Sequence, residues 1–294
     1  MRLITRGDLD GLACAVIITS REEIEDILLV HPQQITDGEV EIGDQDILAN
    51  VPYHPNCAKW FDHHLLTTTN REPPESFEGR FGYAPSAAEL VWDYYGRDPC
   101  FEHLVVETSR FDSARLTRED VLDPQGVILL GFTIDGRSGL GEFRDYFLGC
   151  CDWLKTQSID EVLEQEEVKK RVILLRQRDE EFRRVTAASS RVEKNVVFTD
   201  LRSYDELPIG NRFLIYVLYP QCNVSMRVHW GRKREYVMVV VAHSIINRTC
   251  RTNVGILMSS YGGGGHVGAG STPLPLEQTD EKIAEILSIL KDTG

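Results

Sequence analysis

The sequence predicts an α/β protein of two domains, the first a mainly parallel sheet flanked by helices and the second a smaller α/β domain. Short apolar strands alternate with helical segments up to Tyr95. A charged amphipathic stretch, 158–187, reads as one long helix and precedes a second series of strands near Val196. The length of 294 residues also suits two domains of about 150 residues each. We therefore expect domains at 1–157 and 196–294, joined by a connecting helix and linker at 158–195.

The strands of the first domain are predicted from short apolar runs, and its helices from apolar segments with boundary signals. The strands are expected near Leu3 and at 27–30, 47–50 and 58–61. A helix near Leu12 follows the first strand, and another at 86–95 begins at Ser86, with Glu89 completing a capping box. Strands that alternate with helices in this way predict a parallel sheet.

The second domain is predicted to hold strands at 213–218, 224–230 and 236–242, the last two joined by a charged hairpin. A glycine-rich segment, 262–270, lies between two further apolar patterns. We expect it to be an irregular loop, because adjacent glycines carry a high entropic cost in a helix or strand. Such a loop exposes backbone N–H groups that can bind an anion, with His266 as a further donor. A flexible linker is the alternative.

Two clusters of polar residues stand at predicted strand ends. Asp62, His63 and His64 follow an apolar strand, and Asp8 and Asp10 lie between the first strand and the first helix. Strand ends aim side chains into a crevice, and carboxylates with neutral imidazoles suit Mn, Fe, Co or Zn better than Ca or Mg. A polar turn and an N-cap aspartate are the ordinary alternatives. The two clusters together indicate a metal site.

These motifs occur in the order typical of the DHH phosphoesterase superfamily, and the chain resembles members that carry the DHH-associated C-terminal domain. The matching motifs, which span nearly the whole chain, are Asp8-Leu9-Asp10-Gly11, Asp62-His63-His64, Phe111-Asp112-Ser113 and Gly262-Gly263-Gly264-Gly265-His266. Relatives include single-strand exonucleases, nano-RNases that also dephosphorylate 3′-phosphoadenosine 5′-phosphate, cyclic-dinucleotide phosphodiesterases and exopolyphosphatase-related proteins. The resemblance implies an active site in a cleft between the domains. A pair of Mn²⁺ ions would lie on the first domain, and the glycine–histidine loop of the second would bind substrate.

The resemblance also implies the ligands of each ion. One ion is held by Asp10, His63 and Asp112 together with a bridging aspartate. This chain has Asn50 at the bridging position, and its amide oxygen can ligate but carries no negative charge. Of the two metal sites, the one that contains Asp10 is therefore expected to retain its ligands better.

The other ion is implied to lie at Asp8 and the same bridging position. Arg6 replaces the family's histidine there, and a guanidinium repels a cation and attracts a phosphate. Asp44 and Asp46 are nearby candidates for the bridging carboxylate, although both precede the apolar run that the bridging residue should follow. The expected consequence of these replacements is catalysis with one tightly bound ion, catalysis with a second ion brought by the substrate, or loss of catalysis.

The predicted catalytic residues are His63, His64 and Asp62, of which His63 holds the ion and His64 assists the phosphoryl oxygens. The predicted substrate-binding residues combine guanidinium groups with the glycine loop: Arg6, Arg227, Arg248, Gly263, Gly264, Gly265 and His266. A guanidinium holds a phosphate through paired hydrogen bonds, which favours arginine over lysine in this role.

Charge is divided unevenly along the chain. The segment 201–270 has eight Lys and Arg against three acids, a charge of +5, so the rest of this −14 chain carries −19. An acidic metal-binding part with a basic second part suits a compact anionic substrate. The net negative charge of the whole chain argues against tight binding to duplex DNA. The acidic start of the chain does not resemble a signal peptide, and no apolar run is long enough for a membrane span, so a cytoplasmic location is expected. Seven cysteines without a C-x-x-C pair indicate neither a disulfide framework nor a zinc ribbon.

The sequence therefore predicts a metal-dependent phosphohydrolase that cleaves a short oligonucleotide, a dinucleotide or a nucleotide phosphate. Mn²⁺ is the expected cofactor, as one or two ions, with Mg²⁺ or Co²⁺ as substitutes. An exopolyphosphatase is one alternative, and a catalytically silent nucleotide- or RNA-binding protein with a degenerate metal site is another. The expected partner is a small phosphorylated substrate or a short single-stranded nucleic acid, and a homodimer is left open.

Overall fold

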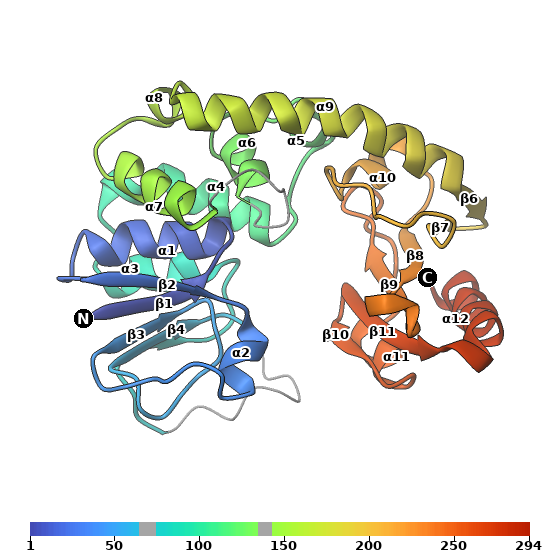
Figure 1. The fold of residues 1–294 in the computed structure, drawn as a ribbon, viewed down its shortest axis with the longest axis horizontal. Helices are drawn as coiled ribbons and strands as arrows, with labels where there is room; N and C mark the ends of the chain where they lie inside the picture. The colour runs from blue at the N-terminus through green and yellow to red at the C-terminus, as the bar shows by residue number, and fades with distance from the viewer. Residues whose placement is uncertain (65–74, 135–142) are drawn as a thin grey trace. The chain divides into compact units, whose positions relative to one another are not determined.

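The computed structural model describes residues 1–64, 75–134 and 143–294 (Figure 1). Internal contacts divide the chain into two compact units. Unit 1 contains residues 1–115 and 124–175, and unit 2 contains residues 116–123 and 176–294. The chain therefore passes three times from one unit to the other. The functional domain limits at residues 157 and 195 stay a prediction.

Unit 1 is built on a five-stranded parallel sheet in the order β2-β1-β3-β4-β5. Its strands are β1 (Arg2–Arg6), β2 (Asp26–Val30), β3 (Asp46–Ala49), β4 (Lys59–Asp62) and β5 (Gly79–Phe81). The first four match the predicted apolar runs. The fifth falls in a polar stretch for which no strand was predicted, and the first part of that stretch, 65–74, lies outside the described residues.

Helices cover both faces of this sheet. They are α1 (Leu9–Thr19), α2 (Pro32–Thr36), α3 (Ala87–Tyr94), η1 (Pro99–Phe101), α4 (Glu102–Asp112), α6 (Gly126–Thr133), α7 (Phe143–Leu154) and α8 (Ile159–Leu163). Because side chains alternate along a strand, Leu3 and Phe61 pack into the core with α1, α3, α4, α6 and α7. Their neighbours Ile4 and Trp60 pack on the opposite face with Ile35 of α2. Figure 1 shows α1 and α2 on opposite sides of the strands.

The predicted connecting helix is broken into two. Ser158 caps α8 with a capping box, and α9 (Glu166–Ser189) begins after a break at 164–165 and runs from unit 1 into unit 2. Val162 and Val168 are both fully buried in the core of unit 1. Six positions separate them, which places them about 120° apart around a straight helix, so the break lets both side chains reach the same core.

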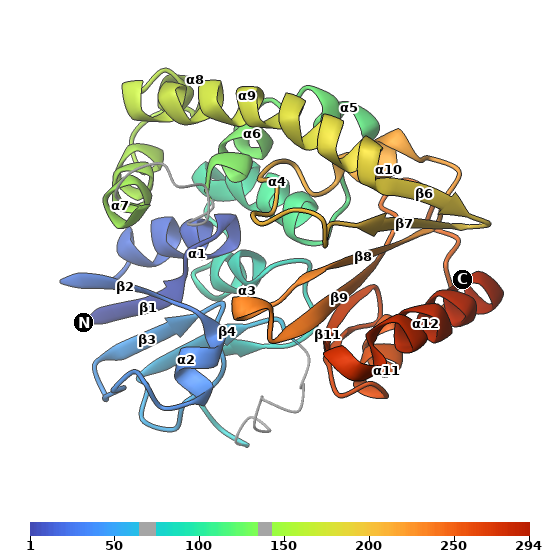
Figure 2. The ribbon, with the colours of Figure 1, turned by 45° about the vertical axis from the view of Figure 1, so that its right-hand side comes forward.

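Unit 2 is built on a six-stranded mixed sheet in the order β10-β11-β9-β8-β7-β6. Its strands are β6 (Ser190–Glu193), β7 (Val196–Asp200), β8 (Val224–Trp230), β9 (Tyr236–His243), β10 (Gly264–His266) and β11 (Ala269–Pro275). Only β7 and β8 pair in parallel. The helices are α5 (Arg118–Leu122), α10 (Leu214–Leu218), η3 (Arg232–Arg234), α11 (Val254–Ser259), η4 (Leu276–Gln278) and α12 (Thr279–Thr293). Side chains of α11 and α12 share a core with β7, β8 and β9, and Figure 2 shows both helices beside this sheet.

The predicted strand at 213–218 is wrong, because these residues form α10. A continuous apolar run of this length fits a buried helix as well as a buried strand. Asn211 decides the outcome locally, since its side-chain oxygen accepts from the N–H of Phe213 at 3.0 Å and turns the chain into the helix. Its amide nitrogen donates to the carbonyl of Val121 at 3.1 Å, which fixes α10 against α5.

The glycine-rich segment was expected to be irregular, but Gly264–His266 form β10, which pairs with β11. The strand requires glycine because its neighbours approach closely. A Cβ on Gly263 would lie 2.0 Å from the carbonyl oxygen of Ser271, and one on Gly265 would lie 2.3 Å from that of Ala269. Gly265 also has a φ of 153°, which other residues rarely adopt. The glycines therefore permit a short edge strand here rather than prevent one.

Within the described ranges, no helix combines the length and the apolar character that crossing a membrane requires.

Candidate metal centre

Strands β1, β3 and β4 are parallel, so their carboxyl ends meet at one edge of the unit 1 sheet. Asp8 and Asp10 follow β1, Asn50 follows β3, and His63 follows β4. Asp112 follows no strand, because it is the last residue of helix α4. The sheet edge and the end of this helix together supply the polar side chains of the site.

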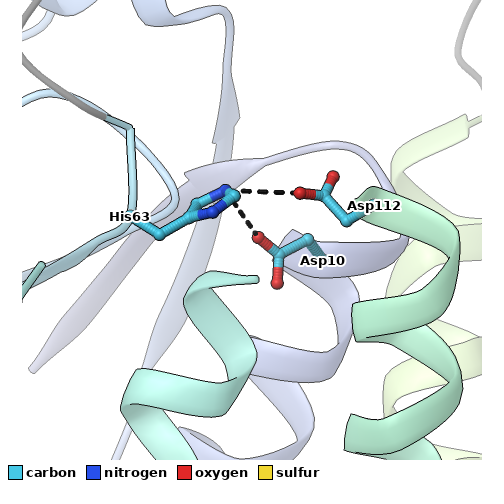
Figure 3. Close-up of side chains that lie close together, drawn as sticks. All are labelled: Asp10, His63 and Asp112. Atoms are coloured by element: carbon cyan, nitrogen blue, oxygen red, sulfur yellow. Dashed lines mark ion pairs between the residues drawn. The ribbon is translucent and has the colours of Figure 1, made fainter. Parts of the chain in front are cut away.

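Asp10, His63 and Asp112 converge although they are far apart in sequence (Figure 3). Each offers one ligand atom, and the three atoms lie within 4.8 Å of one another. Nε2 of His63 lies 3.3 Å from Oδ2 of Asp112 and 3.7 Å from Oδ2 of Asp10. In the part of the chain that the structure describes, this is the one group of three such residues close enough to share an ion.

The His63 ring is fixed with one nitrogen turned toward the carboxylates. Its Nδ1 lies 3.0 Å from the carbonyl oxygen of Ala84, which can only accept, so Nδ1 carries the proton. Nε2 is the ring nitrogen that faces Asp10 and Asp112. That atom is buried and has no hydrogen-bond partner among the described residues. A backbone carbonyl that orients a histidine in this way is typical of metal-ligating histidines.

Asp10 is fully buried and held by the start of helix α3. Its two oxygens accept from the backbone N–H groups of Ala87 and Ala88, both at 2.8 Å. Burial raises the pKa of Asp10 well above its usual range, and the charges of Asp112 and Asp8 raise it further. Burial likewise raises the pKa of Asp112. These neighbouring carboxylates repel one another, and a cation between them would remove the repulsion.

The three residues fit a divalent transition metal. Two carboxylates and one imidazole suit Mn²⁺, Fe²⁺, Co²⁺ or Zn²⁺. Ligands about 2.1 Å from an ion and at right angles lie about 3.0 Å apart, so separations near that value need little rearrangement. Nε2 of His63 is the observation that best supports this fit: it is buried, faces two carboxylates and makes no hydrogen bond to any residue that the structure describes, and a buried polar atom rarely lacks one without a reason.

Asp62 organises the rest of the DHH triplet. Its Oδ1 accepts from the backbone N–H of His63 at 2.9 Å and of His64 at 3.3 Å, and lies 2.7 Å from Nδ1 of His64. Burial of His64 opposes its charged form, yet the hydrogen bond and the charge of Asp62 raise the pKa of the ring overall. Asp62 therefore acts on the site by fixing the backbone and the second imidazole.

Asp8 has quite different partners from Asp10. Its Oδ1 accepts from the N–H of Gly11 and from Nδ2 of Asn50, both at 2.9 Å. Its Oδ2 lies 2.9 Å from Nε of Arg6. The structure thus brings Arg6, Asp8 and Asn50 together, as the motif order suggests, but as an ion pair with an amide.

Neither alternative bridging carboxylate lies at this edge of the sheet. Asp46 begins β3 and forms an ion pair with Arg2 at 2.6 Å, at the opposite end of both strands. Asp44 lies in the turn just before it. Asn50 is therefore the residue that follows β3 at the carboxyl edge.

The predicted substrate-binding residues of unit 2 are spread over its sheet. Arg227 lies in β8, Gly264 in β10, and the strand register places them in one row through Val240 and Ser271. Three strand spacings separate them, which is about 14 Å. Nε of Arg248 donates to the carbonyl of Ile245 at 3.0 Å, in the stretch before α11. The remaining predicted residues, Gly263, Gly265 and His266, lie in or next to β10.

The backbone groups of the site could not be predicted from the sequence. The carbonyl of Ala84 and the N–H groups of Ala87 and Ala88 have no side-chain signature. The prediction of Ser86 as a helix N-cap did contain a signal, because the first N–H groups of a helix need an acceptor. Asp10 is that acceptor.

Comparison with known proteins defines the family. No protein-family model and no curated protein matches the chain. Among solved structures, the pGpG-specific phosphodiesterase PggH from Vibrio cholerae is 37% identical, with a TM-score of 0.84 over 100% of this chain and 99% of that chain. The chain belongs to the DHH phosphoesterase superfamily. The predicted family and the predicted α/β fold are both confirmed.

More distant structures share the DHH fold. An exopolyphosphatase-related protein from Bacteroides fragilis is 14% identical, with a TM-score of 0.56 over 99% of this chain and 92% of that chain. The exonuclease RecJ bound to manganese is 12% identical, with a TM-score of 0.56 over 98% of this chain and 89% of that chain. At these identities the similarity shows the fold alone.

Proposed function

We propose that this protein is a divalent-metal-dependent phosphodiesterase that hydrolyses a short, 5′-phosphorylated linear dinucleotide such as pGpG. The converging side chains of Asp10, His63 and Asp112 carry the proposal, since they form a ligand set for a catalytic ion. Identity of 37% to a pGpG-specific phosphodiesterase, over nearly all of both chains, supports the substrate class.

The reaction would consume one water molecule and release two mononucleotides. An oxygen–phosphorus bond forms from water, the bond from phosphorus to the 3′ oxygen breaks, and a proton passes to that leaving oxygen. A divalent ion, when bound, supplies a Lewis acid that polarises a phosphoryl oxygen and lowers the pKa of water. Mn²⁺ is the proposed ion, because two carboxylates and one imidazole suit it.

The residues of the chain position these groups. Ala84 fixes the His63 ring through Nδ1, and the start of α3 fixes the Asp10 carboxylate. Asp62 holds the ring of His64, which is proposed to contact phosphoryl oxygens. Because these partners are backbone groups or buried carboxylates, the site is set before an ion or substrate binds.

The predicted phosphate-binding residues of unit 2 fit an anionic ligand larger than one phosphate. Arg227 and Gly264 of β10 lie about 14 Å apart. A single phosphate is too small to contact both, whereas a dinucleotide extends over most of that distance. The basic charge of segment 201–270 also favours an anionic ligand. Both observations favour a dinucleotide over inorganic phosphate.

A substrate panel tests the proposal. The purified chain, treated with EDTA and then supplied with Mn²⁺, Mg²⁺ or Ca²⁺, would be incubated with pGpG, a longer single-stranded RNA, polyphosphate and duplex DNA. We expect GMP from pGpG with Mn²⁺ and little product with Ca²⁺ or from the duplex. Release of phosphate from polyphosphate alone would instead support an exopolyphosphatase. No product from any substrate would contradict the proposed activity.

A catalytically silent nucleotide-binding protein is the second candidate. It is favoured by the replacement of the bridging carboxylate by Asn50 and by the guanidinium beside Asp8. Calorimetry distinguishes the two functions, because the silent protein would bind pGpG with an intact dinucleotide recovered afterwards. Recovery of GMP from the calorimeter cell would instead show that the protein is an enzyme.

A further inference from the structure

The second ion implied by the family does not fit the groups around Asp8. Both carboxylate oxygens already have partners: Oδ1 accepts from Gly11 N–H and Asn50 Nδ2, and Oδ2 forms an ion pair with Nε of Arg6. An ion at Oδ2 would lie beside the guanidinium of Arg6, which would repel it. The Asp8 side therefore already contains a positive charge.

Asn50 presents the wrong atom to a cation. Its amide nitrogen faces Oδ1 of Asp8, and the reverse orientation would set two oxygens against each other. The backbone maintains this arrangement, because the N–H of Asn50 donates to the carbonyl of Phe61 at 2.9 Å and its φ is 58°. Asparagine tolerates that conformation better than most residues. The residue is also buried, so the amide has little freedom to turn.

Arg6 retains donors for a second partner. Its ion pair with Asp8 uses Nε, and its side chain is 43% exposed. Among the described residues, the side-chain N–H groups of Arg6 form no hydrogen bond. The charge of Arg6 is also felt by Asp112, a residue of the metal cluster. The guanidinium thus lies beside the site with N–H groups available for an anion.

We propose that Arg6 replaces one of the two divalent ions, so that each chain binds a single ion at Asp10, His63 and Asp112. The guanidinium, fixed by Asp8, then provides the second positive charge for the phosphoryl oxygens of the substrate. The phosphate contact rests on the proposed function, whereas the ion count does not. A chain that binds one ion and hydrolyses nothing would therefore contradict the function and leave this inference intact.

Ion counting tests the inference without an activity assay. The wild-type chain would be stripped with EDTA, titrated with Mn²⁺ by calorimetry, and examined by electron paramagnetic resonance. We expect one ion per chain and the spectrum of an isolated Mn²⁺. The double variant Arg6→His with Asn50→Asp restores a neutral ligand and a bridging carboxylate, so it should bind two ions with a spin-coupled spectrum.

Three further variants separate the contributions. Asn50→Asp alone should still bind one ion, because Arg6 remains in place beside Asp8. Arg2→His is the matched control, since Arg2 forms a similar ion pair at the other end of the same strand, and its count should stay at one. Asp112→Asn should lose the single ion. Two coupled ions in the wild type or in Asn50→Asp, or a single ion in the folded double variant, would overturn the inference.

Discussion

Asp8 and Asp10 are separated by one residue, but the chain surrounds them with opposite charges. Asp10 is buried beside a carboxylate and an imidazole, with backbone donors behind it. Asp8 is partly exposed beside a guanidinium and an amide nitrogen. A family motif therefore does not by itself specify a metal ligand. The charge of the neighbouring groups decides whether the carboxylate needs a cation or already has one.

The largest expected effect comes from removing a ligand on the Asp10 side. His63→Ala should reduce Mn²⁺ affinity and pGpG turnover by more than about 100-fold, because a ligand matters more than the groups that orient it. The apolar strand β4 remains, so the fold should persist. Calorimetry and product chromatography measure both losses. His103→Ala, an exposed histidine of α4, is the control and should behave as wild type. Unchanged turnover by the His63 variant would exclude it as a ligand.

A smaller loss is expected when the orienting carboxylate is made neutral. Asp62→Asn keeps an oxygen for the N–H groups of His63 and His64 but removes the charge beside the His64 ring. We expect a loss of about 10- to 100-fold in turnover or metal affinity. Steady-state kinetics at several Mn²⁺ concentrations would separate the two. Asp93→Asn, a surface carboxylate of α3, should have no effect. An equal loss in both variants would point to general destabilisation.

A substitution beside Asp8 should change the affinity for substrate rather than the affinity for metal. Arg6→Gln removes the guanidinium, and we expect KM for pGpG to rise about tenfold, equivalent to about 1.4 kcal/mol of lost binding. The Mn²⁺ affinity of the Asp10 cluster should fall little or rise, because a nearby positive charge has gone. Kinetics paired with calorimetry checks both parts. A large fall in metal affinity with an unchanged KM would show that Arg6 stabilises the metal-binding side chains and does not contact the substrate.

The smallest effect is expected at the other end of the same strand. Burial opposes ionisation of Asp46, but the ion pair with Arg2 lowers its pKa overall. A lowered pKa stabilises the fold at neutral pH, and that stability is lost as the pH falls through the folded-state pKa. Arg2→Gln should therefore cost about 1 kcal/mol at pH 7 and reduce the loss of stability on acidification. Urea unfolding at neutral and acidic pH measures both effects. The KM and turnover of Arg2→Gln should stay at the wild-type values, unlike the KM of Arg6→Gln.

The sequence predicts four of the five strands of unit 1, because these strands are short apolar runs bounded by polar turns. It also identifies Arg6 and Asn50 as departures from the family. It could not show that both contact Asp8, since Asn50 reaches it across 42 positions only when β1 and β3 pair. The carbonyl of Ala84 is equally hidden, because every residue has one.

The errors in unit 2 have two physical causes. The run at 213–218 is apolar throughout, so it contains no periodicity to separate helix from strand, and the side chain of Asn211 settles the choice. The glycines near β10 predict an irregular loop, because ordering glycine has a high entropic cost. They form a strand instead, because the chain approaches β11 too closely for side chains to fit. Both outcomes depend on partners that are remote in sequence.

The assignment of residues 116–123 to unit 2 affects how the protein is synthesised. Helix α5 packs against α10, and the carbonyl of Val121 pairs with a side chain 90 positions later. At a ribosome that adds about 5 to 20 residues per second, this segment waits on the order of ten seconds for its partners. Leu116 and Val121, both buried in the finished protein, are uncovered during that time. Unit 2 thus cannot be completed during translation before α10 has been synthesised, although one of its helices is made early in the chain.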